Sequence, residues 1–111
     1  MTYEVSHGGR ILHVTYSPEM VFTGTRDTSD KNYWSPKEFM DEAEFRKKYF
    51  KWDYSQFING YVSGWLKGDA KLWFEAQRMS TASDAVLKRE EGWPLFKDIF
   101  IEYFETVMGL Y

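Results

Sequence analysis

The sequence has 111 residues, no cysteine and a formal net charge of −3, with an isoelectric point near 5.4. The absence of cysteine excludes disulfides and thiolate metal sites, and the acidic balance argues against non-specific coating of nucleic acid, which needs a basic surface. Residues 1–20 contain no apolar signal-peptide core, and no run reaches the ~18 to 20 apolar residues of a membrane span. We therefore expect one domain, residues 1–111, located in the cytoplasm and without membrane contact.

Aromatic side chains are unusually frequent, with 5 Trp, 8 Tyr and 9 Phe. Each ring can bury ~150 to 250 Å², and a chain of this length has a limited interior. The surplus indicates either a large aromatic core, or a core together with an aromatic-lined pocket or partner surface. Both interpretations fit the composition.

Residues 2–16 predict a β-hairpin, because Gly8-Gly9 is a two-residue turn that tolerates positive φ at both positions. With these two residues as the loop, Glu4 pairs with His13, and the apolar side chains of both strands share one face except for Ile11. Residues 20–25 alternate poorly between apolar and polar side chains. The strands therefore form either this hairpin or a three-stranded antiparallel meander.

A first helix is predicted over residues 36–51. Ser35 is suited to the N-cap, Pro36 to the first helical position and Glu38 to the third, where it completes a capping box. Acidic residues lie early and basic residues late in this segment, which suits the helix dipole.

A second helix is predicted over residues 54–66, capped by Asp53 and ended by Gly68. Gly60, Gly64 and Gly68 are four residues apart and form a bare groove, which predicts close approach of another backbone as compensation for their low helix propensity. The opposite face is polar but uncharged, whereas freely solvated helix faces usually carry charge. This face consists of Ser55, Gln56, Asn59 and Ser63.

A third helix is expected over residues 70–79, followed by a short turn that Ser83 or Asp84 caps. Four apolar residues share one side of this helix at a spacing of three to four. They are Leu72, Trp73, Ala76 and Met79.

The last helix, residues 94–108, carries two apolar ladders of four-residue spacing, at 95, 99, 103 and 107 and at 96, 100, 104 and 108. Together they cover well over half of the helix circumference, at ~100° per residue. Such a helix is either central to the core or covered on a second side by a partner. The predicted fold is therefore α+β: an N-terminal hairpin or meander packed on about four helices, with Phe100 and Phe104 of the last helix near the centre.

No motif points to catalysis, to a cofactor or to a metal site. His7 and His13 lie on opposite faces of the predicted hairpin, so they do not converge on a metal or a proton-transfer site. Asp27 and Asp30 lack the alternate carboxylates, central glycine and terminal glutamate of a calcium-binding loop. No metal and no cofactor is expected, and an enzymatic role is without support.

The sequence favours a non-enzymatic protein-binding module of the inhibitor or accessory-factor type, acting through surface contact as a homodimer. Short, acidic, aromatic-rich chains of this kind are common among accessory proteins of phages and mobile elements. Two alternatives stay open: a nucleic-acid-binding protein that uses the basic and aromatic stretch 46–52, and a small enzyme or ligand carrier with an aromatic pocket. The predicted contact surface combines uncharged polar groups, an aromatic and cations at its edge. Its residues are Lys47, Lys48, Lys51, Trp52, Gln56, Asn59 and Ser63.

Overall fold

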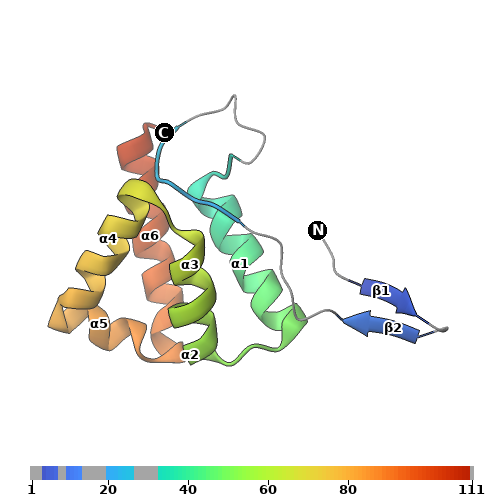
Figure 1. Cartoon of the computed structure of the whole chain (residues 1–111). Coiled ribbons are helices and arrows are strands. Elements are labelled where there is room, and N and C mark those ends of the chain that lie inside the picture. The colour runs from blue at the N-terminus through green and yellow to red at the C-terminus, as the bar shows by residue number, and fades with distance from the viewer. Residues whose placement is uncertain (1–3, 8–9, 14–19, 27–32, 111) are drawn as a thin grey trace.

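The computed structural model describes residues 4–7, 10–13, 20–26 and 33–110, and helices make up most of this part of the chain (Figure 1). Two short strands come first. The elements in chain order are β1 (Glu4–His7), β2 (Arg10–His13), α1 (Pro36–Phe50), α2 (Tyr54–Gln56), the π-helical η1 (Phe57–Val62), α3 (Ser63–Trp65), α4 (Gly68–Met79), α5 (Thr81–Leu87), the 3₁₀ turn η2 (Glu90–Gly92) and α6 (Trp93–Met108).

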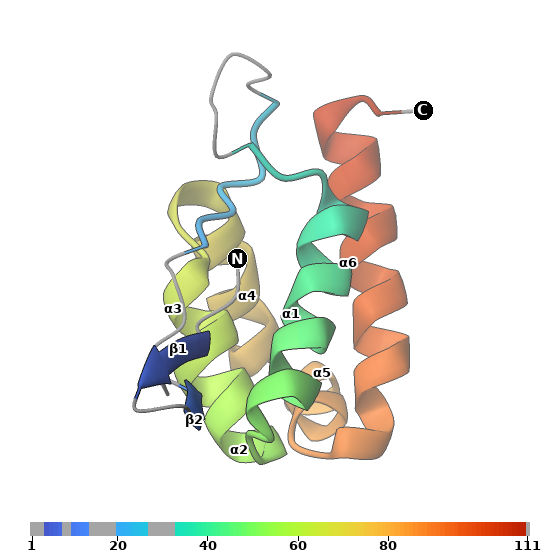
Figure 2. The same ribbon diagram turned by 90° about the vertical axis from the view of Figure 1, so that its right-hand side faces the viewer.

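The long helices lie side by side and alternate in direction. Segments α2, η1 and α3 follow one another without a break in helical backbone, so residues 54–65 act as one helix with a π-helical middle. Helices α1 and α6 are antiparallel neighbours (Figure 2), and α4 runs back along the 54–65 helix, while α5 turns the chain at one end of the bundle. This arrangement lets every long helix direct one face toward a common interior.

The predicted α+β class, with a hairpin or meander packed on the helices, is wrong, because the folded body of the described chain is helical. Strands β1 and β2 pair with each other alone, Glu4 opposite His13, and Figure 1 shows them beside the helices rather than layered against them. Residues 20–25 add no third strand. Phe22 instead forms one parallel β-bridge with Leu66, and the carbonyl oxygen of Phe22 accepts a hydrogen bond from the Lys67 amide at 3.0 Å. Two short strands bury too little surface to form a layer of their own.

The start of α1 agrees with the sequence prediction. Ser35 is the N-cap, its hydroxyl accepts the Glu38 amide at 3.2 Å, and Pro36 occupies the first turn. The helix ends at Lys51, which takes the left-handed conformation with φ of 57°. Arg46 is buried, contrary to the basic surface that the sequence suggests for this end of the helix.

The interior is built from aromatic rings that come from all the long helices and from the segments beside them. Phe22, from the stretch between β2 and α1, lies 5.1 Å from both Phe39 of α1 and Phe100 of α6, measured between ring centroids. Phe100 and Phe104 are 4.7 Å apart, and both are buried. The prediction that these two residues occupy the core is confirmed, and tilted ring pairs of this kind add to the stabilisation from buried area.

The glycines of the 54–65 helix do not approach another backbone. A Cβ atom built at Gly60 or Gly64 would meet nothing within 4 Å, so the predicted close contact there is wrong. Gly68 begins α4 with φ of 56° and does not end the preceding helix. That helix ends at Trp65, and the next residue, Leu66, has an extended backbone. The short helix α5 likewise begins at Thr81, before the predicted caps.

Candidate functional site

Helix α6 buries only one of its two apolar ladders. The ladder at positions 96, 100, 104 and 108 faces the interior and is buried along its whole length. The other ladder lies on the surface, where its exposed fractions are 54% for Leu95, 44% for Ile99, 42% for Tyr103 and 57% for Val107. Because solvent-exposed apolar side chains in a continuous row are costly for a free surface, this face is the first candidate for contact with a partner.

Helix α4 repeats the same arrangement. Its buried residues are Ala70 and Phe74. Most of the apolar side that the sequence identified points outward, with Leu72 65% exposed, Met79 86% exposed and Ala76 also exposed. Its fourth member, Trp73, is half-buried and packs on Phe100 and Phe104 of α6.

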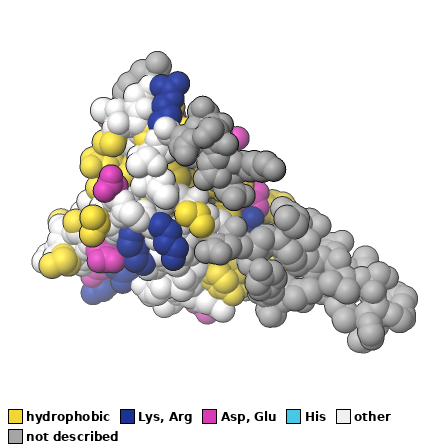
Figure 3. Space-filling view, turned by 45° about the horizontal axis from the view of Figure 1, so that its top comes forward, with side chains coloured by type: hydrophobic (Ala, Val, Ile, Leu, Met, Phe, Trp, Pro, Cys, Tyr) yellow, Lys and Arg dark blue, Asp and Glu magenta, His cyan; other side chains and the backbone are white. Residues whose placement is uncertain are grey.

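The two outer apolar faces meet at a pair of stacked rings. Trp73 of α4 and Tyr103 of α6 have centroids 5.2 Å apart and ring planes 22° apart. Figure 3 shows hydrophobic side chains along the side of the molecule that α4 and α5 occupy. We call the combined surface the α4–α6 strip. It consists of Leu72, Trp73, Ala76 and Met79 from α4 and Leu95, Ile99, Tyr103 and Val107 from α6.

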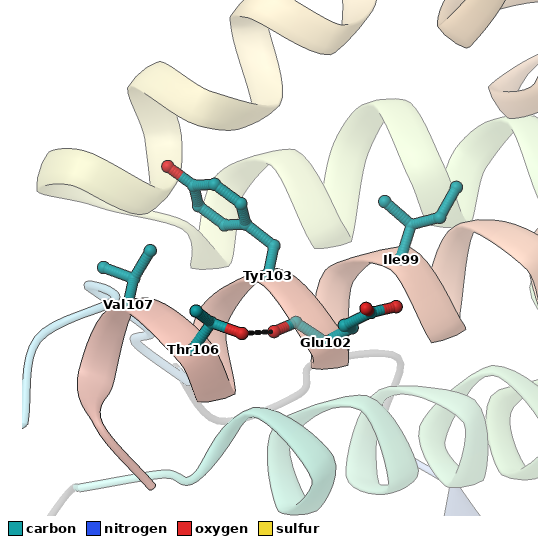
Figure 4. Close-up of a pocket in the computed structure, with 5 residues that line it drawn as sticks. All are labelled: Ile99, Glu102, Tyr103, Thr106 and Val107. Atoms are coloured by element: carbon teal, nitrogen blue, oxygen red, sulfur yellow. Dashed lines mark hydrogen bonds between the residues drawn. The ribbon is translucent and has the colours of Figure 1, made fainter. Parts of the chain in front are cut away.

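A shallow groove of about 360 Å³ lies on the α6 half of the strip. Figure 4 shows Ile99, Tyr103 and Val107 projecting to the same side of α6, with the Tyr103 ring reaching toward α4. Thr106 and Glu102 complete the lining, and the Thr106 hydroxyl donates to the carbonyl oxygen of Glu102 at 2.8 Å. The groove is open and apolar, a shape that suits side chains of another macromolecule better than a small polar substrate.

Acidic residues border the strip on both long sides. At ~100° per residue, Glu102 lies ~20° from Leu95 around α6, and Glu75 lies ~40° from Met79 around α4. Asp98 is the next residue beyond Glu102 on the same side of α6. All three carboxylates are exposed and make no ion pair within the described part of the chain.

The basic residues of α4 turn the other way. Lys71 donates to the carbonyl oxygen of Ser63 at 2.6 Å and to its hydroxyl at 2.8 Å. Arg78 donates to Asn59 at 2.7 Å and pairs with Asp84 at 2.8 Å. Both cations thus face the 54–65 helix and α5, and the strip keeps an acidic border.

The basic residue of α6, Lys97, is directed to α1. It binds Asp41 at 3.0 Å and also Glu44, which in addition accepts from the Trp93 indole at 3.1 Å. Burial would lower the pKa of Lys97, but the hydrogen bonds to Glu44 and Asp41 outweigh it and raise the pKa. The pKa of Asp41 is lowered by hydrogen bonds from Lys37 and Lys97. This cluster joins α1 to α6 on the side away from the strip.

The structure does not gather the seven sequence-predicted contact residues into one surface. Trp52 is buried and stacks on Tyr61 with 3.5 Å between ring centroids, so it belongs to the core. Lys47 pairs with Glu90 at 2.9 Å, whereas Lys48 and Lys51 are exposed.

The uncharged polar face of the 54–65 helix is partly satisfied within the chain. Asn59 and Ser63 accept the Arg78 and Lys71 hydrogen bonds described above, and Gln56 is exposed. Cations of α4 therefore account for the lack of charge on this face. Whether Gln56 and its neighbours also bind a partner stays a prediction.

Two residues of the basic and aromatic stretch 46–52, Arg46 and Trp52, are withdrawn from the surface. The Arg46 side chain pairs with Glu42 at 2.8 Å and lies over the Trp65 ring, with 5.6 Å from its guanidinium carbon to the ring centroid. With Arg46 and Trp52 buried, the exposed cations of this stretch lack the neighbouring exposed indole that stacking on bases would use.

A small cavity of about 110 Å³ lies near the start of α6, lined by Tyr54, Trp93 and four charged residues of α1 and η2. Burial raises the pKa of Tyr54 to about 12, so this hydroxyl stays protonated at neutral pH. The cavity is smaller than the ~300 to 1,000 Å³ typical of small-molecule sites.

Within the described residues, no group of three or more His, Asp or Glu side chains is arranged to hold a metal ion. His7 and His13 fall in β1 and β2, where the structure gives the backbone but no side-chain placement, and Asp27 and Asp30 lie outside the described residues. None of the described helices has the length and apolar content needed to cross a membrane.

Comparison of the chain with models of protein families, with curated proteins and with solved structures gives no match.

Proposed function

We propose that the protein is a non-enzymatic protein-binding module, of the inhibitor or accessory-factor type, that acts through the α4–α6 strip. One observation carries the proposal: two neighbouring helices both expose a second apolar face, and these faces adjoin at the Trp73–Tyr103 stack. Contiguous apolar surface bordered by polar residues marks interaction sites on folded proteins.

The composition of the strip supports this interpretation. Interface centres are depleted in charge and enriched in aromatic side chains and methionine, with charged residues at the rim. The strip has Trp73 and Tyr103 where its two helices meet and Met79 near one end, and Glu75, Asp98 and Glu102 lie along its long sides. Tyrosine and tryptophan are also frequent among residues whose truncation costs the most binding energy.

A second copy of the chain is the occupant that the aromatic surplus led us to expect, and it would make the protein a homodimer. A different protein is the other occupant of the same class. In both cases the strip is the contact surface, and the sequence-predicted residues Gln56, Asn59 and Ser63 are a competing surface.

Affinity capture from native host cells, followed by mass spectrometry, tests the proposal with matched baits. Ile99→Asp places a charge in the strip, whereas Phe45→Asp makes the same change at a 53% exposed aromatic of α1. Gln56→Lys alters the competing surface. We expect Ile99→Asp to lose a partner, or the second copy, that the other two baits retain. Loss with Gln56→Lys alone would move the contact surface to the 54–65 helix and contradict the proposal.

A further inference from the structure

We infer that the partner of the α4–α6 strip is an amphipathic helix whose apolar face is bordered by lysine or arginine, an inference that rests on the proposed function. The distribution of charge around the strip carries it. Glu75 borders the α4 side, and Glu102 and Asp98 border the α6 side, all exposed and without an ion pair in the described residues.

The cations of α4 and α6 themselves are directed elsewhere. Lys71 and Arg78 of α4 bind residues of the 54–65 helix and α5, and Lys97 of α6 binds carboxylates of α1. The strip is thus an apolar surface between two acidic edges. Complementary charge at the rim of an interface favours association and suppresses wrong partners.

A second copy of the chain would meet the strip with the same acidic edges. In a two-fold symmetric dimer each patch faces its own copy. Since both long sides of the strip are acidic, either way of placing the axis brings Glu75 or Glu102 close to another carboxylate. Like charges across an interface oppose association, and a basic partner avoids this repulsion.

The shape of the strip favours a helix over an extended peptide. The Trp73–Tyr103 stack joins α4 to α6, and the groove on α6 offers a place into which side chains of a third helix can pack. The rows from Leu95 to Val107 span ~18 Å, the length of a helix of about twelve residues. A peptide that binds as an added β-strand would instead need an unpaired strand edge, and α4 and α6 are both helical.

A display library of 18-residue helices tests the inference on the full chain. The library fixes leucines at i, i+3, i+4 and i+7 and randomises the flanking positions among Lys, Arg, Glu, Asp, Gln and Ser. Four baits are compared. They are the natural chain, a border variant that combines Glu75→Gln with Glu102→Gln, the strip variant Ile99→Asp, and Phe45→Asp as the folding control for the strip variant.

We expect the natural chain to enrich helices with Lys or Arg at the flanks. The best of these helices should bind the border variant about tenfold more weakly than they bind the natural chain. Their affinity for the natural chain should also fall as the salt concentration is raised. The Ile99→Asp bait should enrich nothing, whereas Phe45→Asp should behave as the natural chain.

Two other outcomes separate the inference from the proposed function. Enrichment of acidic or uncharged flanks, or a dimer in light scattering that Ile99→Asp dissociates, would overturn the basic partner and leave the strip as a binding surface. A monomer that enriches no helix would overturn both.

Discussion

The assignment of the two α6 ladders predicts opposite results for two adjacent residues. Phe100 is 0% exposed, whereas Ile99 is 44% exposed. The Phe100 ring lies 4.7 Å from Phe104, 5.1 Å from Phe22 and 5.7 Å from Trp73, measured between centroids. Phe100→Ala therefore removes a ring that is packed on several sides, and such a change costs ~3 to 5 kcal/mol in the free energy of unfolding.

Ile99→Ala is the matched control. The side chain is nearly half exposed, little cavity forms, and alanine has the higher helix propensity, so we expect a change within ~1 kcal/mol. Urea unfolding followed by circular dichroism at 222 nm measures both variants at low micromolar protein. With a total stability of ~5 to 15 kcal/mol, Phe100→Ala should be close to unfolding while Ile99→Ala resembles the natural protein. Equal costs for the two variants would refute the assignment of the faces.

Three further predictions concern stability. Gly64→Ala should raise the melting temperature, since an added Cβ meets nothing within 4 Å and alanine favours a helix over glycine by ~1 kcal/mol. Gly92→Ala should lower the melting temperature, because its Cβ would lie 2.2 Å from the Val86 carbonyl oxygen. Ser35→Ala should cost about 1 kcal/mol in chemical unfolding, because the hydroxyl that accepts a first-turn amide at 3.2 Å is lost. The lowered pKa of Asp41 stabilises the fold above the ordinary value of 3.8, and this stabilisation disappears as the pH falls through the folded-state value. As the pH is lowered below 4, the melting temperature of Asp41→Asn should therefore fall less steeply than that of the natural protein. Equal slopes of melting temperature against pH for the two proteins would contradict this prediction.

The sequence carried the local features of the helices well. Ser35 with Pro36 and Glu38 defined the start of α1, and Asp53 accepts the Gln56 amide at 2.8 Å as the predicted cap of the next helix. These features depend on neighbours in the chain, so they can be read from short stretches. The doubled ladder of α6 was also visible, and it predicted a helix that is either central to the core or covered on a second side by a partner.

Features set by distant contacts were not accessible in the same way. The apolar row at Leu72, Ala76 and Met79 is evident from spacing, but its outward direction follows from which side of α4 meets the core. Arg46 is one of the late basic residues of the first helix, but it is buried and lies over Trp65, which is 19 positions further along the chain. The α+β class failed for the same reason, because alternation in a hairpin does not say whether helices cover it.

The candidate surface followed a similar division. Gln56, Asn59 and Ser63 were identified by their lack of charge, and the explanation is largely internal, since Arg78 and Lys71 of α4 supply the charge opposite two of them. The doubled periodicity in α6 corresponds to the exposed apolar face on which the proposed function rests. It could have directed attention to Ile99 and Tyr103 from the sequence alone.

The central claim is that a partner covers the α4–α6 strip, and position-resolved photo-crosslinking in native host cells measures this most directly. A photoreactive phenylalanine analogue is placed singly at Ile99, at Leu72, at Gln56 and at Phe45, all of which are exposed. If a partner covers the strip, we expect crosslinked products from positions 99 and 72 and none from positions 56 and 45. Crosslinks from position 56 or 45, with positions 99 and 72 silent, would contradict it.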